Sequence, residues 1–262
     1  MKKIVIKIGS SSLTAGSPKL SRPDMVEIAR QIAHLHQAGH QVIFVCSGAI
    51  AAGREILPSI KTNNELPPKQ MLASLGQVRL MQLWTEFFGV YGVLIGQVLL
   101  TRHDITNEKS YLNAQNTFSA LLEHRLLPIV NENDTVATEE ITVGDNDNLS
   151  ALVTKLTGSE LLIILTDQEG VYTKDPRLHA DATLISKIER IDDAIHILAQ
   201  GSSNPHGLGR GGMKTKIEAA KLAIESGATT VIASAKVPDV LIQLAAGKPI
   251  GTLFTPCKIS TH

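Results

Sequence analysis

Short apolar runs alternate with helix-like segments along this chain, and no other feature of the sequence restricts its fold as strongly. Strand-like runs occupy residues 4–6, 41–46, 93–100, 161–165, 229–233 and 251–254, and another runs through Ile129. Residues 161–165, Leu-Leu-Ile-Ile-Leu, form the clearest central strand. Because strands that alternate with helical patterns are typical of βαβ units, the sequence predicts an α/β fold with a mainly parallel sheet.

The helical segments between these runs have recognisable ends and apolar stripes. Ser21 is a predicted N-cap, with Pro23 in the first turn, and Gly39 is a predicted C-terminal stop. A long helix is expected to begin at Pro67, with an apolar side made of Met71, Leu72, Leu75, Val78 and Leu83. Other helices are predicted at residues 111–123, 149–156 and 213–226 and after Pro238, with a hairpin arm at 138–143 and an irregular, lid-like excursion at 171–209.

Length and charge narrow the class of protein. A chain of 262 residues can form one large α/β domain or two small ones. Its 25 basic residues balance 25 acidic ones, so no net field attracts nucleic acid or an anionic membrane. The N-terminal residues lack a signal-peptide core, no apolar run reaches transmembrane length, and Cys46 lies in an apolar run as a free thiol would. We therefore expect a cytoplasmic protein without nucleic-acid or membrane partners.

Four polar turns follow predicted strands, where ligands bind in open α/β sheets. They begin at Lys7, Ser47, Asn131 and Thr166. The third turn is the richest, because amides and carboxylates crowd residues 131–134 and 144–148. Such a segment suits a polar ligand, and the alternative is a solvated turn that Asn and Asp favour through local hydrogen bonds.

Two lysine-bearing turns are candidates for phosphate binding. Lys7 precedes Gly9, and glycine lets phosphate oxygens approach backbone amides closely; a lysine that merely extends to solvent from a strand end is the alternative. Residues 209–216 form a Gly-rich turn into a helix, whose free N–H groups attract anions, although a flexible turn with solvated lysines has the same composition. Two lysines, a glycine cradle and carboxylates between them are typical of phosphoryl transfer.

Together these strings resemble the amino-acid kinase superfamily and, within it, the glutamate 5-kinase family. The strings are KIGS at 7–10, SGAIAAG at 47–53, NEND at 131–134, GDNDNLS at 144–150, LTD at 165–167, Asp175-Pro176 and GGMKTK at 211–216. The resemblance extends from Lys2 to about Phe254, and Arg210 stands where the family usually has threonine. It implies a three-layer α/β/α sandwich and a single kinase domain over 1–262, with the glutamate side mainly in 1–160, the ATP side mainly in 161–262 and no PUA domain.

The resemblance also implies the reaction and the roles of individual residues. The reaction is the ATP-dependent phosphorylation of the side-chain carboxylate of L-glutamate to L-glutamyl 5-phosphate, the first step of proline biosynthesis, with Mg²⁺ as the metal. No residue is assigned as a metal ligand. The implied catalytic residues are Lys7, Lys216 and Asp147, and the implied glutamate-binding residues are Ser47, Gly48, Ala49, Asp134 and Asn146. The implied nucleotide-binding residues are Lys7, Gly9, Ser10, Thr166, Asp167, Asp175, Pro176, Arg210, Gly211, Gly212, Met213, Lys214, Thr215 and Lys216.

Further expectations concern regulation and assembly. By the family's pattern we expect a homo-oligomer, a dimer or a tetramer, and feedback inhibition by proline with contributions from Lys69 and Gln70. Three other functions compete with this interpretation. One is another amino-acid kinase, acting on acetylglutamate, aspartate or a nucleoside monophosphate, and the second is a catalytically silent regulatory module. The third, a dinucleotide oxidoreductase, is disfavoured because no GxGxxG follows the first strand.

Overall fold

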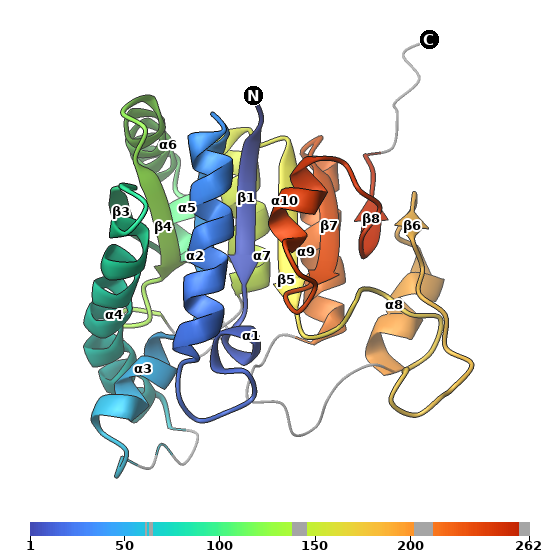
Figure 1. Cartoon of the computed structure of the whole chain (residues 1–262), viewed down its shortest axis with the longest axis horizontal. Coiled ribbons are helices and arrows are strands. Elements are labelled where there is room, and N and C mark those ends of the chain that lie inside the picture. Colours follow the sequence, from blue (N-terminus) through green and yellow to red (C-terminus); the bar gives the residue numbers. More distant parts are fainter. Residues whose placement is uncertain (61, 63–64, 138–145, 202–211, 257–262) are drawn as a thin grey trace.

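A computed structural model of the chain describes residues 1–60, 62, 65–137, 146–201 and 212–256 (Figure 1). Eight strands form one sheet in the order β3-β4-β2-β1-β5-β7-β8-β6. Every pair of neighbours is parallel except β7 and β8, which run antiparallel. The strands are β1 (Lys3–Ile8), β2 (Gln41–Cys46), β3 (Ile95–Leu100), β4 (Leu127–Glu132), β5 (Leu161–Thr166), β6 (Lys187–Ile188), β7 (Thr229–Ser234) and β8 (Thr252–Phe254). The predicted mainly parallel sheet is confirmed.

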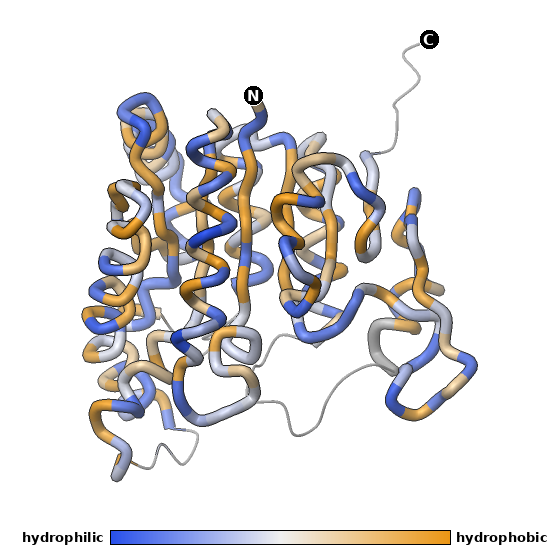
Figure 2. Tube along the Cα trace, in the orientation of Figure 1, coloured by the Kyte–Doolittle hydropathy of each residue, from blue (hydrophilic) through white to orange (hydrophobic). Residues whose placement is uncertain are grey.

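Helices cover both faces of this sheet, which confirms the three layers. The helices are α1 (Ser10–Thr14), α2 (Arg22–Gln37), α3 (Ala49–Ile56), α4 (Leu66–Gly89), α5 (Arg102–Thr106), α6 (Glu108–Glu123), α7 (Asn146–Thr157), α8 (Asp193–Gly201), α9 (Met213–Glu225) and α10 (Val240–Ala245). One apolar core joins the sheet to α2, α3, α4 and α10, and a second joins it to α6, α7 and α9. Figure 2 shows hydrophobic residues along the strands, with polar residues on the outer sides of the helices.

Side-chain alternation along β1 determines which layer each residue meets. Ile4, Ile6 and Ile8 belong to the core under α2 and α4, whereas Val5 belongs to the core under α7 and α9. Successive side chains of a strand point to opposite faces of the sheet, so Lys7 shares the face of Val5. Lys7 therefore projects toward the helix layer that contains α7 and α9.

Several predicted ends and faces are correct, and others are wrong. Ser21 caps α2 as predicted, because its hydroxyl accepts from the Asp24 N–H at 3.5 Å. The apolar side predicted for α4 is partly wrong: Leu72 and Leu83 are buried as predicted, but Met71 is 44% and Val78 is 62% exposed. The buried residues of α4 are Lys69, Leu72, Ala73, Gly76, Leu80, Leu83, Trp84 and Phe88. The sequence stripe failed because the helix also packs small residues against α3.

Other boundaries differ from the predictions. The strand through Ile129 continues to Glu132, so Asn131 and Glu132 are buried strand residues. The helix predicted at 149–156 begins earlier, at Asn146, and the excursion at 171–209 includes β6 and α8. The strand predicted at 93–100 begins at Ile95. The predicted hairpin arm at 138–143 lies outside the described residues.

A glycine contact brings α3 and α4 unusually close together. A Cβ atom on Gly76 would lie 1.8 Å from the Ala49 carbonyl oxygen and 2.4 Å from the Gly53 nitrogen. A Cβ atom on Gly53 would lie 2.1 Å from the Leu72 carbonyl oxygen. Only glycine permits this approach of two backbones. The contact matters for function because α3 begins at Ala49, directly after the Ser47-Gly48 turn.

We expect Gly76→Ala to destabilise the protein by about 3 kcal/mol or more, because the added methyl group must push the two helices apart. Urea unfolding measures the change in the free energy of unfolding. The matched control is Gly89→Ala at the end of the same helix, where an added Cβ meets no atom within 4 Å. The control should be neutral or slightly stabilising. Equal stability of the two variants would contradict the close backbone contact.

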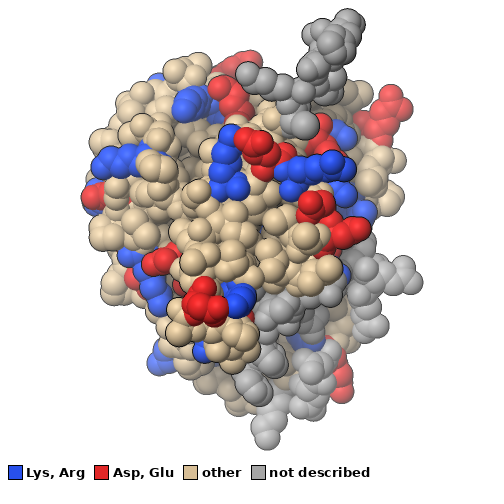
Figure 3. Space-filling model, turned by 90° about the vertical axis from the view of Figure 1, so that its right-hand side faces the viewer, with Lys and Arg blue, Asp and Glu red and all other residues tan. Residues whose placement is uncertain are grey.

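Among the described residues, no helix is long and apolar enough to cross a bilayer. On the side of the molecule shown in Figure 3, basic and acidic side chains are interspersed over the described residues.

Candidate active site

The four polar turns predicted from the sequence lie at one edge of the sheet. They follow β4, β2, β1 and β5, which are consecutive neighbours in the sheet and run parallel. Their carboxyl ends point the same way, toward the end of the molecule that holds α1 and α3 (Figure 1). Parallel strands therefore gather segments that are more than a hundred residues apart into one site.

Asp147 is the centre of this site. It lies in the first turn of α7, is fully buried, and forms ion pairs with both predicted lysines. Lys7 Nζ donates to Asp147 Oδ1, and Lys216 Nζ donates to Asp147 Oδ2 at 3.1 Å. Thr215 Oγ1 also donates to Oδ2, at 2.7 Å. The three implied catalytic residues thus meet at Asp147, from one strand and two helices.

The ionisation of Asp147 follows from these contacts. Burial by itself raises the pKa of the Asp147 carboxyl group, because a charged group loses hydration in the interior. The charges of Lys7 and Lys216, together with the hydrogen bonds from Lys7 and Thr215, outweigh burial and hold that pKa well below its ordinary range. Asp147 is therefore a carboxylate at neutral pH and holds two ammonium groups in fixed positions.

The two lysines differ in what they approach. A Cβ atom on Gly9 would lie 3.4 Å from Lys7 Nζ, so the ammonium group folds back over the turn that follows β1. Lys216 and Thr215 lie in the first turn of α9, which Gly212 precedes as N-cap. Thr215 Oγ1 also lies 2.9 Å from the Gly212 carbonyl oxygen, within hydrogen-bond distance. Helix starts of this kind present free N–H groups and the positive end of the helix dipole.

Two other residues of the Gly-rich turn, Lys214 and Met213, make contacts elsewhere in the protein. Lys214 is exposed and lies 3.9 Å from Glu218 in an i,i+4 pair, and Met213 is buried in the core. Arg210 and Gly211 lie outside the described residues.

A group of amides lies beside the lysines, under the Ser47-Gly48 turn. Asn146 Nδ2 contacts Ser47 Oγ at 2.9 Å, the Cys46 carbonyl oxygen at 3.2 Å and Asn131 Oδ1 at 2.8 Å. Asn146 is 2% exposed, and its Oδ1 has no hydrogen-bond partner among the described residues. A buried acceptor of this kind is costly unless a donor reaches it, so it suits a ligand with an N–H group.

Gly48 gives this turn its shape. Its φ of 111° is disfavoured for residues with a side chain, and it is the N-cap of α3. The adjoining Ala49 is buried. The predicted substrate turn, residues 47–49, is therefore fixed by glycine geometry on one side and by Asn146 on the other.

Asp134 lies half-buried in the turn after β4. Burial raises the pKa of its carboxyl group to about 6, since it loses hydration without gaining a charged partner among the described residues. Gln70 Nε2 anchors the following segment by donating to the Ala137 carbonyl oxygen at 3.0 Å. Lys69 is buried one residue earlier in α4. Gln70, one of the two residues suggested for regulation, thus contacts the segment that follows Asp134.

The predicted nucleotide residues after β5 occupy two adjoining turns. Thr166 ends β5 and donates to Asp167 Oδ1 at 3.0 Å, and Asp167 is exposed. Asp175 is buried and accepts from the Arg177 guanidinium at 2.7 and 3.0 Å, which stabilises the turn that includes Pro176. The Asp167 charge also acts on Arg177, so the two turns are close enough to interact electrostatically. Ser10 begins α1 directly after Gly9.

Two residues of the site, Asn131 and Gln77, were not among the candidates predicted from the sequence. Asn131 belongs to the amide group, and its position in the NEND string was a usable signal. Gln77 accepts from Asn131 Nδ2 at 2.8 Å, and no local pattern marked it, since it lies in the middle of α4.

Comparison with known proteins agrees with this geometry. The model of the amino acid kinase family matches residues 2–234, and the chain belongs to that family. It is similar to proteins named glutamate 5-kinase: that of Pasteurella multocida is 50% identical over 258 residues, that of Serratia marcescens is 49% identical over 251, and that of Photobacterium profundum is 51% identical over 253. These alignments cover 97, 96 and 97% of this chain but only 69, 68 and 66% of the respective relatives.

Proposed function

We propose that this protein is a phosphotransferase that uses ATP to phosphorylate the side-chain carboxylate of L-glutamate, giving L-glutamyl 5-phosphate for proline biosynthesis. The convergence of Lys7 and Lys216 on buried Asp147 carries the proposal. Two ammonium groups held at the carboxyl edge of the sheet suit the transfer of a highly charged phosphoryl group. The likeness to glutamate 5-kinases over nearly the whole chain supports glutamate as the acceptor.

In the proposed step, an oxygen of the glutamate side chain attacks the γ-phosphorus of ATP. A new P–O bond forms, the bond from the γ-phosphorus to the bridging oxygen breaks, and ADP leaves. The glutamate carboxylate, with a pKa near ~4.3, is already ionised at neutral pH, so no general base is needed. The obstacle is repulsion between two anions, and Lys7 and Lys216 reduce it while stabilising the charge of the transferring group.

In this proposal Asp147 positions the two lysines, and the turns on the nucleotide side bind ATP. Asp147 keeps both ammonium groups in place, and the turns after β1 and β5 and before α9 provide backbone N–H groups and side chains for the nucleotide. Mg²⁺, when bound, neutralises phosphate charge. It fits this site because such an ion is held mainly by phosphates and water with one or two carboxylates. We assign it no ligand among the described residues, where no cluster of three His, Cys, Asp or Glu side chains occurs.

The glutamate backbone groups are assigned to the amide side. The free Asn146 Oδ1 and the Asp134 carboxylate are acceptors for the α-ammonium group, and the turn at 47–49 receives the rest of the amino acid. This arrangement suits a free amino acid with an α-ammonium group.

A direct assay tests the acceptor. The protein is incubated with ATP, Mg²⁺ and hydroxylamine, which traps an acyl phosphate as a hydroxamate. Glutamate should give product, while aspartate and N-acetylglutamate should give little. If only aspartate or only N-acetylglutamate gave product, that compound would be the acceptor in place of glutamate. If ATP were not turned over with any of the three compounds, a silent regulatory module would be favoured.

We expect the affinity for glutamate to depend on the ionisation of Asp134. Below about pH 6 its carboxyl group becomes protonated and loses the charge that pairs with the α-ammonium group, so the glutamate KM should rise as the pH falls through 6. Asp134→Asn should raise this KM at least ~30-fold at pH 7.5, from the cost of breaking a desolvated charge pair on one side. The pH dependence should also disappear in that variant. Steady-state kinetics between pH 5.5 and 8 measures both effects, with the KM for ATP as the control. A parallel loss of ATP affinity would move Asp134 to the nucleotide side.

The proposal extends to organisation, regulation and location. We assign 1–262 to one kinase domain whose glutamate side lies mainly in 1–160 and whose ATP side lies mainly in 161–262. Feedback inhibition by proline is proposed near Lys69 and Gln70, because Gln70 holds the segment after Asp134. We further propose a dimer or tetramer, and a cytoplasmic location, which suits the free buried thiol of Cys46.

A further inference from the structure

We propose that Gln77, on the outer helix α4, is a positioning residue that orients the amides of the glutamate site. This inference rests on the proposed function. Gln77 lies across the Asn131 side chain from Asn146, and the three residues come from α4, β4 and α7.

The three amides form a relay with one direction. Gln77 Oε1 accepts from Asn131 Nδ2 at 2.8 Å, and Asn131 Oδ1 accepts from Asn146 Nδ2 at 2.8 Å. The backbone N–H of Glu132 also donates to Asn131 Oδ1, at 2.9 Å. Asn146 and Asn131 therefore each present the NH₂ group to the next acceptor, and Asn146 Oδ1, at the donor end of the relay, has no partner among the described residues.

This direction decides what the site offers to a ligand. The two ends of a primary amide have nearly the same shape and opposite hydrogen-bonding character. With Asn146 Nδ2 committed to protein acceptors, its Oδ1 remains as an acceptor for the α-ammonium group. Gln77 supports this state because it accepts from Asn131 Nδ2, which would otherwise be a buried donor without that partner. Loss of such a partner costs more than the bond itself contributes, so the Asn131 amide would shift or rotate.

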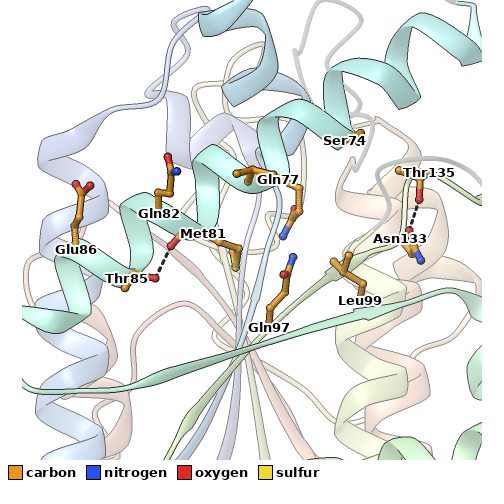
Figure 4. Close-up of a pocket in the computed structure, with 11 residues that line it drawn as sticks. Ser74, Gln77, Met81, Gln82, Thr85, Glu86, Gln97, Leu99, Asn133 and Thr135 are labelled. Atoms are coloured by element: carbon orange, nitrogen blue, oxygen red, sulfur yellow. Dashed lines mark hydrogen bonds between the residues drawn. The ribbon is translucent and has the colours of Figure 1, made fainter.

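Gln77 is also partly exposed, on the side of α4 that borders a groove. It lines a groove of about 670 Å³ between α4 and β3, the edge strand of the sheet. Figure 4 shows Gln77 and Gln97 pointing toward one another across this groove. Gln77 Nε2 has no hydrogen-bond partner among the described residues, so only the oxygen end of this amide is fixed, and Asn131 fixes it.

Three variants test the role of Gln77 in the full chain. Gln77→Met removes the acceptor and keeps the length and helix propensity of the side chain. Gln77→Glu keeps an acceptor at the same position. Gln82→Met is the matched control, because Gln82 lies on the same helix, lines the same groove and is exposed. Glutamate KM, ATP KM, kcat and the thermal melt are measured for each.

We expect Gln77→Met to raise the glutamate KM about 3- to 10-fold, the range for one lost neutral hydrogen bond. Its kcat and ATP KM should stay within about 2-fold of the wild type, which marks a loss of ground-state binding of glutamate alone. Gln77→Glu should recover most of the affinity, and Gln82→Met should behave as the wild type. A glutamate KM unchanged in Gln77→Met, or equally raised in Gln77→Glu, would overturn the proposal.

If Gln77→Met lowers the melting temperature, a double-mutant cycle still tests the role of Gln77. Asn131→Ala removes the middle of the relay, so adding Gln77→Met to it should raise the glutamate KM no further. Additive increases would overturn the proposal, because independent effects add. The outcome is separable from the proposed reaction: a wild-type protein that does not phosphorylate glutamate refutes both, whereas an active wild type with an unaffected Gln77→Met refutes only the relay.

Discussion

Replacing Lys216 by alanine is expected to lower turnover by about 10²–10³-fold, the usual loss for one preorganised donor that stabilises transition-state charge. Lys216 Nζ lies 3.1 Å from Asp147 Oδ2 and is 6% exposed, so neither water nor a flexible neighbour can replace it in the same position. The glutamate KM should change far less than kcat, because Lys216 is proposed to act in phosphoryl transfer and not in binding glutamate. Lys7→Ala should behave in the same way.

The hydroxamate assay at saturating glutamate and ATP measures this loss. The matched control is Lys221→Ala, which removes an exposed lysine from the same helix. A thermal melt separates lost chemistry from lost structure. Turnover of Lys216→Ala equal to that of Lys221→Ala would remove Lys216 from the mechanism.

Asp147→Asn is expected to affect both turnover and stability. The amide keeps the shape of the carboxylate and removes the charge that faces two buried ammonium groups. Turnover should fall at least ~10-fold, since charge-assisted bonds are about twice as strong as neutral ones and the lysines would be held less firmly. Removing one partner from a buried ion pair costs about 3–5 kcal/mol, so the free energy of unfolding should fall by a similar amount.

The difference in the free energy of unfolding between the wild type and Asp147→Asn should depend on pH in a definite direction. The pKa of Asp147 is lower in the folded protein than in the unfolded chain, so its contribution to stability is complete above the ordinary carboxyl range, near pH ~4, and is lost as the pH falls below it. The stability gap between the wild type and Asp147→Asn should therefore narrow in acid. Asp193→Asn, an exposed first-turn aspartate of α8, is the control and should change stability by less than ~0.5 kcal/mol.

A simple helix-capping role for Asp147 predicts another result. Asparagine would then substitute almost freely, and turnover and melt would both match the wild type. The structure argues against this role, because Asp147 lies inside the first turn of α7 and is fully buried. The sequence had suggested a helix from residue 149, and the earlier start of α7 at Asn146 places Asp147 inside the helix.

The local pattern predicted the elements well where one physical signal dominated. The strand at 161–165 and the helix after Ser21 were predictable because apolar runs, capping residues and glycine stops act over a few neighbouring residues. The face of α4 was not predictable, because Gly76 meets α3 backbone and this contact depends on a partner helix. Arg210 and Gly211 were assigned to the nucleotide from the family resemblance, and they lie outside the described residues.

The class of fold, the four polar turns and the family resemblance could be predicted from the sequence, because the succession of elements and the identity of short strings are local properties. The buried cluster of Lys7, Asp147 and Lys216 emerged only in the folded protein, since it requires α7 and α9 to pack on the face of the sheet toward which Lys7 of β1 projects. Packing also placed Gln77 against Asn131, across 54 positions of the chain. The physical reason is the same in both cases: the direction in which a side chain points follows from its own strand or helix, whereas the atom that it meets depends on how distant elements pack.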